Sequence, residues 1–169
     1  MRTVSLVLWA VVVARSASGQ TNAGSLPTGN ETAGAAIVAG SGECLSCHRI
    51  LKAGSRSGPD LTDIGVVRTA DQLRAALLDP DAEILPENRR YRVVTRGGVT
   101  TVGTLLNHDT FQVLIRDAKE QLRSFQKADL REHGLVEGSS MPSYRATLSP
   151  QQLADVIAYL STLKGVAPQ

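Results

Sequence analysis

The sequence predicts a mainly α-helical domain that carries an inserted antiparallel β-meander of three or four short strands. Apolar residues recur at helical spacing in two segments near the ends of the chain, 32–38 and 153–163, and in a third segment at 69–77. Residues 91–126 are instead rich in β-branched side chains or alternate between apolar and polar ones. This order places the strands inside a helical domain.

Residues 1–19 are expected to be a signal peptide. Arg2 gives a positively charged start, and the apolar run 4–13 is too short to span a bilayer as a lasting anchor. The small residues Ala17 and Gly19 fit a cleavage site before Gln20. The protein is therefore expected to be exported, to the periplasm or an equivalent compartment. An uncleaved membrane anchor is the alternative interpretation.

Residues 20–30 contain little apolar surface and are expected to form a flexible lead-in. Residues 31–169 are expected to form one domain, with the β insertion at about 90–126. Loss of Arg2 and Arg15 with the signal peptide changes the count from 18 basic and 16 acidic residues to 16 of each. A nearly neutral mature chain argues against nucleic acid as a partner.

The first and last helices are expected to pack against each other. The first is predicted to begin near Glu31 and to lead into Cys44, and glycines such as Gly34 weaken it in isolation but allow a close helix crossing. The last is predicted to begin at Ser149, where Gln152 completes a capping box. Its apolar stripe comprises Leu153, Val156, Ile157, Leu160 and Leu163.

A third helix and the strands lie between these two. Thr69 and Gln72 form a second predicted capping box, and Asp79-Pro80 ends the helix that it begins. Gly97-Gly98 is a tight hairpin signal, and His108 is expected in a later turn. The predicted strands are 91–95, 99–106, 111–115 and 121–125.

The stretch Cys44-Leu45-Ser46-Cys47-His48 has the spacing of an attachment site for haem c. Each thiol can add to one vinyl group of the porphyrin, and one short helical turn can present both sulfurs to one porphyrin edge. His48 follows directly, so its imidazole can bind the iron as proximal ligand. One covalently attached haem c is therefore the expected cofactor.

A redox disulfide and half of a zinc site are alternative interpretations of the cysteine pair. The chain has two cysteines, and no βαβ pattern leads into them. Zinc would have to recruit His108 or His133, neither of which lies at zinc-finger spacing. Export favours haem c, because haem attachment outside the cytoplasm consumes thiols that would otherwise be oxidised there.

The second axial ligand is expected to be Met141, the only methionine left after signal removal. Its Ser-Ser-Met-Pro-Ser setting is unlike an apolar core stripe, and Tyr144 nearby is expected to contact the haem. His133 is the rival donor, and an open iron position is a further alternative. A carbonyl in the loop at Gly58-Pro59 is expected to accept the other imidazole proton of His48.

These features together resemble class I cytochrome c. More narrowly, the chain is similar to the bacterial haem-binding domain often fused to large exported dehydrogenase-like proteins. The resemblance implies a cytochrome c-like helical haem domain, with haem attached at Cys44 and Cys47 and with His48 and Met141 as axial ligands. The stretches that carry it are the cysteine motif, Gly58-Pro59-Asp60-Leu61, Leu78-Asp79-Pro80, Met141-Pro142 and Leu148-Ser149-Pro150-Gln151-Gln152-Leu153-Ala154-Asp155.

The expected function is that of an exported monohaem c-type cytochrome, which is an electron-transfer protein and not an enzyme. It would carry single electrons between redox partner proteins, such as an exported dehydrogenase or a terminal electron acceptor. The alternatives are a haem-bearing subunit of an exported dehydrogenase complex, and a haem enzyme or gas sensor with an open iron position. Residues 88–131 contain nine basic and four acidic residues, so the strands are expected to shape a docking face.

Overall fold

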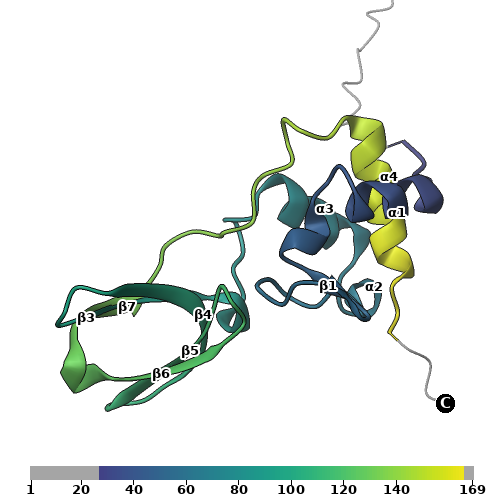
Figure 1. The fold of residues 1–169 in the computed structure, drawn as a ribbon. Helices are drawn as coiled ribbons and strands as arrows, with labels where there is room; N and C mark the ends of the chain where they lie inside the picture. Colours follow the sequence, from purple (N-terminus) through teal and green to yellow (C-terminus); the bar gives the residue numbers. More distant parts are fainter. Residues whose placement is uncertain (1–26, 166–169) are drawn as a thin grey trace, which may run out of the picture.

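The computed structural model describes residues 27–165, so the predicted signal peptide and most of the predicted lead-in lie outside the described residues. A helical unit and a curled antiparallel sheet lie side by side, and the segments 79–89 and 136–149 join them (Figure 1). Within residues 27–165, no helix is long and apolar enough to cross a membrane.

The prediction of a mainly α fold is wrong. The described chain is 32% helical and 27% strand, and its main sheet has five strands instead of three or four. The physical reason is that the inserted segment folds around a hydrophobic core of its own, which requires more strands than a small meander on a helical body.

Helices α1 (Glu31–Ala39) and α4 (Pro150–Thr162) cross at close range, which confirms the predicted pairing. A Cβ atom on Gly34 would overlap the carbonyl oxygen of Asp155, so only glycine permits this approach. The buried carboxylate of Asp155 also accepts hydrogen bonds from Asn30 N and Gln151 Nε2, both at 2.8 Å. Apolar packing and a satisfied buried acid therefore hold the two helices together.

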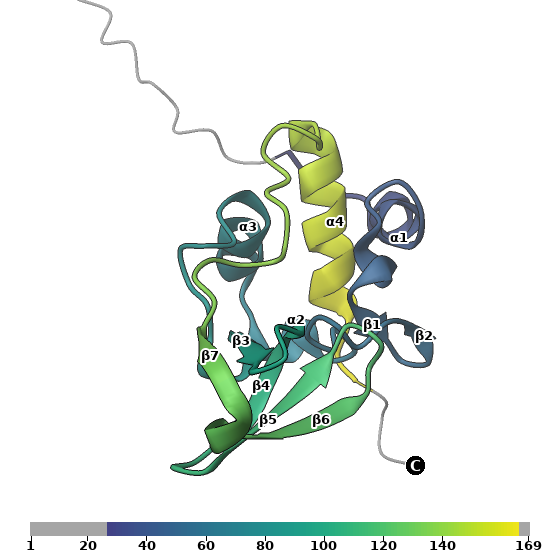
Figure 2. The ribbon, with the colours of Figure 1, turned by 60° about the vertical axis from the view of Figure 1, so that its left-hand side comes forward.

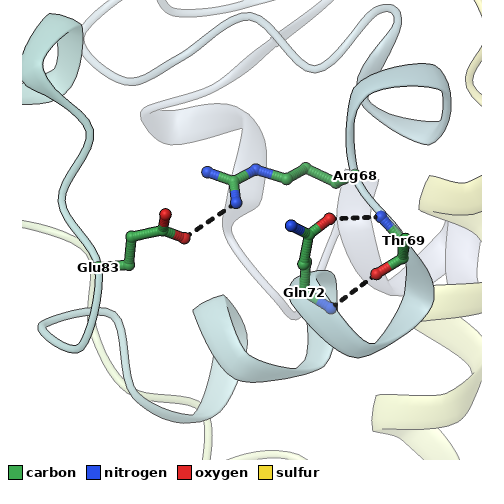
Figure 3. Close-up of polar contacts among 4 residues, drawn as sticks. All are labelled: Arg68, Thr69, Gln72 and Glu83. Atoms are coloured by element: carbon green, nitrogen blue, oxygen red, sulfur yellow. Dashed lines mark hydrogen bonds and ion pairs between the residues drawn. The ribbon is translucent and has the colours of Figure 1, made fainter.

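Both predicted capping boxes are present. In α4 the Ser149 hydroxyl accepts from Gln152 N, and the Gln152 side chain accepts from Ser149 N. Thr69 and Gln72 make the same pair of bonds at the start of α3 (Ala70–Leu78), as Figure 3 shows. These reciprocal bonds satisfy backbone groups that would otherwise lack partners at the helix starts.

The segment that follows α3 turns back towards the start of that helix. Arg68 forms an ion pair with Glu83 at 3.0 Å, drawn in Figure 3. The short helix α2 (Ile64–Val67) precedes this arginine, and a small ribbon of β1 (Arg49–Ile50) and β2 (Ala53–Gly54) follows the cysteine motif. The core of the helical unit comprises Ile37, Val38, Ile50, Leu73, Leu77, Leu153, Val156, Ile157 and Leu160.

The main sheet is an antiparallel meander whose last strand returns to its first, in the order β6-β5-β4-β3-β7. Four strands match the predicted ones within about two residues, but the fifth, β7, extends the sheet to Leu135, beyond the predicted limit of 126. His108 ends β4 and does not lie in a turn as predicted. The strands are β3 (Arg90–Thr95), β4 (Thr100–His108), β5 (Gln112–Asp117), β6 (Leu122–Gln126) and β7 (Leu130–Leu135).

The curl of the sheet encloses a second core (Figures 1 and 2). Every strand contributes at least one side chain, because alternate residues of each strand point to the inner face. Buried in this core are Tyr91, Val93, Val113, Ile115 and Leu130, with Leu105 and Phe125 packed against them. The two units therefore have separate hydrophobic cores.

We predict that Gly34→Ala lowers the free energy of unfolding by about 1–3 kcal/mol, because the added methyl group forces α1 away from α4. Denaturant unfolding followed by circular dichroism measures the change. Gly134→Ala is the matched control, since a Cβ atom on Gly134 in β7 would meet no atom within 4 Å. Its expected change is within about 0.5 kcal/mol, and equal losses in the two variants would contradict the prediction.

Candidate haem site

The cysteine motif forms one tight turn shortly after α1. A 3₁₀ helix spans Cys44–Ser46, and His48 N donates a hydrogen bond to Cys44 O at 2.8 Å, which confirms the predicted helical turn. Cys44 packs against the core of the helical unit, whereas Cys47 is exposed. Burial raises the pKa of the Cys44 thiol above its ordinary value, and a hydrogen bond with Tyr144 partly opposes this effect.

The loop after the motif holds the imidazole of His48. Nδ1 lies 2.8 Å from Pro59 O, as the sequence predicted for a carbonyl of this loop. Because a carbonyl oxygen can only accept, Nδ1 carries the proton and Nε2 keeps its lone pair. Burial lowers the pKa of His48, while the hydrogen bond to Pro59 opposes this shift. The neutral imidazole that results is the form that binds a metal ion.

Gly58 allows this loop to lie directly against the imidazole ring. A Cβ atom at Gly58 would lie 3.1 Å from both Cε1 and Nδ1 of His48 and 3.2 Å from Cys47 O. The Gly58 N–H also donates to Cys47 O at 2.7 Å. The loop therefore fixes the orientation of the ring from one side and leaves Nε2 as the available donor atom.

Met141 lies in the segment 136–149, which Figure 2 shows running from β7 past α3 to the start of α4. It is half-buried and packs against the same core as Cys44. Tyr144 fastens this segment to the cysteine motif, because its hydroxyl donates to Gly42 O at 2.7 Å. Its N–H donates to Leu77 O at 2.8 Å. The structure thus brings the Met141 segment close to the start of the cysteine motif.

The bond between Tyr144 and Gly42 was not predicted from the sequence, which suggested only contact with a haem. The two residues are 102 positions apart, so no local pattern connects them. The useful signal is the position of Tyr144, three residues after the lone candidate methionine and immediately before the segment that leads to α4.

His108 and His133 do not join the cysteines. Their rings stack on Tyr91, with centroid distances of 6.1 Å and 6.0 Å, and Tyr91 Oη lies 2.8 Å from His133 Nδ1. Both histidines belong to the sheet, whereas the cysteines belong to the helical unit. Among residues 27–165, no group of three or more His, Cys, Asp or Glu side chains could hold a metal ion. This placement gives no support to a zinc site at the cysteine pair or to His133 as an axial ligand.

The residues of the motif fit a covalently attached haem c. Two thiols stand on one turn, and the adjoining imidazole presents an unprotonated Nε2, which is the donor set that such a group requires. A half-buried thioether, Met141, lies in a segment that is hydrogen-bonded to Gly42, two residues before Cys44. Neither a scan against protein-family models nor a search of the curated proteins finds a match to this chain.

The pKa of Tyr144 predicts how the stability of the fold changes at alkaline pH. Burial, with a further contribution from neighbouring Cys44, raises this pKa to about 12, above the value of about 10 for an unfolded chain. The fold therefore favours the neutral phenol, and this stabilisation is complete below about pH 10 and is lost as the pH rises towards about 12. We expect wild type to lose more stability over this interval than Tyr144→Phe, which has no hydroxyl to ionise.

At neutral pH the same variant should be less stable than wild type by about 1 kcal/mol, because the hydrogen bond to Gly42 is lost. Denaturant unfolding at a series of pH values measures both effects. Tyr159→Phe, in α4, is the control for loss of a hydroxyl elsewhere in the helical unit. Superimposable pH profiles for wild type and Tyr144→Phe would show that the phenol is not perturbed by the fold.

Proposed function

We propose that the protein is an exported monohaem c-type cytochrome that carries single electrons between redox partners. The observation that carries this proposal is the state of His48, which follows the paired cysteines directly. Its Nδ1 donates a hydrogen bond to Pro59 O, so its Nε2 keeps a lone pair that could bind iron. Paired thiols beside an oriented imidazole are what covalent attachment and proximal ligation of haem require.

Each residue of the candidate site has a separate role in this proposal. Cys44 and Cys47 would bind the porphyrin covalently, and His48 and Met141 would be the axial ligands. A bound haem c supplies an iron centre that gains and loses one electron. Pro59 orients His48 and raises the basicity of its Nε2, which is one of the means by which a protein tunes a haem.

The helical core supports the same site by excluding water. Cys44 and Met141 both pack against it, so the groups that would contact the porphyrin stand on an apolar surface. Low polarity around a haem influences its reduction potential, and a rigid surround limits rearrangement on electron transfer. Ligation by both His48 and Met141 would leave no open position on the iron, which favours an electron-transfer protein over an enzyme.

A haem-bearing subunit of an exported dehydrogenase complex is the second candidate. It is favoured by large apolar side chains that remain exposed in β6 and in two turns of the sheet: Leu122 at 68% in β6, Val99 at 63% between β3 and β4, and Phe111 at 71% between β4 and β5. A partner subunit that covers such residues would remove apolar surface from water. Co-purification with an exported dehydrogenase would select this candidate.

Haem attachment is tested by intact-mass analysis of protein matured in a host that attaches haem c. Wild type should exceed its polypeptide mass by one haem, and the double variant Cys44→Ala with Cys47→Ala should not. Colourless wild-type protein with the bare polypeptide mass would overturn the proposal.

Axial ligation is tested by adding carbon monoxide to the reduced protein. Met141→Ala should retain its haem and take up the gas much faster than wild type, because the sixth position is then open. His133→Ala is the matched control, since His133 lies in the sheet, and it should behave as wild type. Equally rapid uptake by wild type would instead favour a haem enzyme or gas sensor.

The basic residues at the start of β3 suggest a docking face for an acidic partner. Arg92 is paired with Glu132 at 3.0 Å, whereas Arg89 and Arg90 form no ion pair with another described residue. Replacing both Arg89 and Arg90 with Gln should slow reduction by an acidic redox protein at low salt, by up to about tenfold. The difference should disappear at high salt.

Stopped-flow kinetics measures this rate. A double variant outside the sheet, Arg145→Gln with Lys164→Gln, makes the same change in net charge and is the control. If both double variants slow the reaction equally, net charge and not a docking face accounts for the effect.

A further inference from the structure

The turn between β5 and β6 contacts the loop that orients His48. Glu120 Oε1 in this turn accepts hydrogen bonds from Arg56 N at 2.8 Å and from Ser55 Oγ at 3.2 Å. Arg116 Nη1 at the end of β5 donates to Arg56 O at 3.4 Å. The contact joins two units with separate cores, and it does so three residues before Pro59.

Hydrogen bonds, not apolar packing, hold the loop at 55–59. Its five residues are all half-buried or exposed. Ser55 N donates to Leu45 O at 3.1 Å, and Gly58 N donates to Cys47 O at 2.7 Å. Pro59 O in turn accepts from His48 Nδ1. A loop without a buried anchor has low local stability, so the loss of one bond changes the time that it spends in place.

Glu120 is well placed to supply such a bond from outside the loop. Its backbone adopts a left-handed conformation with φ of 62°, and its N–H donates to Asp117 O at 2.9 Å. The Asp117 side chain accepts from Lys119 N and Gln121 N at 2.9 Å and 3.0 Å. Hydrogen bonds within the turn therefore hold its conformation. The hydrogen bond from Arg56 N lowers the pKa of Glu120, so its carboxylate is ionised at neutral pH.

We propose that Glu120 is a positioning residue for the proximal imidazole. By holding Ser55 and Arg56, it fixes the loop whose Pro59 carbonyl orients His48, and it thereby couples the inserted sheet to the haem ligand. The contact between the turn and the loop is independent of any cofactor. The last step, an effect on an iron ligand, rests on the proposed function.

The test uses the haem-loaded protein and measures solvent exchange of the His48 Nδ1 proton by nuclear magnetic resonance. Glu120→Ala should speed this exchange about two- to fivefold, the range expected for the loss of one exposed charged contact. Glu120→Gln should restore most of the protection, because its amide oxygen can still accept from Arg56 N. A purely electrostatic role would not be rescued in this way.

Glu132→Ala and Glu132→Gln are matched controls. Glu132 is a carboxylate of the same sheet that pairs with Arg92 in β3 and with Arg131 in β7. Its variants should leave the exchange rate unchanged. Wild-type exchange in a folded Glu120→Ala variant would overturn the inference. Should that variant fail to fold, wild-type exchange in Glu120→Asp, whose shorter side chain withdraws the carboxylate from Arg56, would overturn it equally.

The Arg56 amide proton separates failure of this inference from failure of the proposed function. Its chemical shift should follow ionisation of the Glu120 carboxylate in wild type, and this dependence should vanish in Glu120→Ala. A chain that carries no haem but keeps this dependence overturns the proposed function while retaining the contact. A haem-loaded chain without the dependence overturns the positioning role alone.

Discussion

The crossing of α1 and α4 is the contact on which the candidate site depends. Gly34 allows the two helices to touch at the Asp155 carbonyl, and the Asp155 carboxylate binds the residue that caps α1. The cysteine motif begins a few residues after α1 ends, and the segment that carries Met141 ends at the cap of α4. One helix pair therefore fixes the start of the segment that bears Cys44 and the end of the segment that bears Met141. Because protein interiors are close-packed, a shift at this crossing would be transmitted to both.

Hydrogen bonds also hold the two segments that join the helical unit to the sheet. Ser139 N donates to Asp81 Oδ1 at 2.6 Å, which joins the outgoing and returning segments to each other. Ser143 Oγ and Tyr144 N then donate to the last two carbonyls of α3. The returning segment is thus bonded to α3 on one side and to Gly42 on the other before it reaches α4. The position of Met141 is defined by these bonds and by its packing against the helical core.

Features coded by neighbouring residues could be predicted from the sequence, and features that depend on distant pairing could not. The capping boxes at Thr69 and Ser149 each need two residues three positions apart, so the pattern is complete within one turn. Strand β7 reads Leu-Arg-Glu-His-Gly-Leu, without clear alternation, and it exists because it pairs with β3 some 40 residues earlier. This fifth strand contributes Leu130 to the second core, which the local pattern of residues 130–135 does not indicate.

In the candidate site, too, some features could be predicted from neighbouring residues, whereas others depend on contacts between distant segments. The motif at Cys44 to His48 and the role of Pro59 follow from local spacing and from the needs of a metal-bound imidazole. The roles of Tyr144 and Glu120 depend on contacts between segments that the fold brings together. Glu120 in particular reads as an ordinary charged turn residue, since nothing in its neighbours indicates that it faces Arg56.

The two ends of the inserted sheet lie next to each other. Tyr91 is paired with Leu135 across β3 and β7, and Val136 N donates to Arg90 O at 2.9 Å. A short bridge between these ends would close the chain without opening the helical core. The sheet therefore enters and leaves the helical scaffold at one place, so the long stretch of chain between His48 and Met141 adds a second folded unit without separating the two ends that join it to the helices.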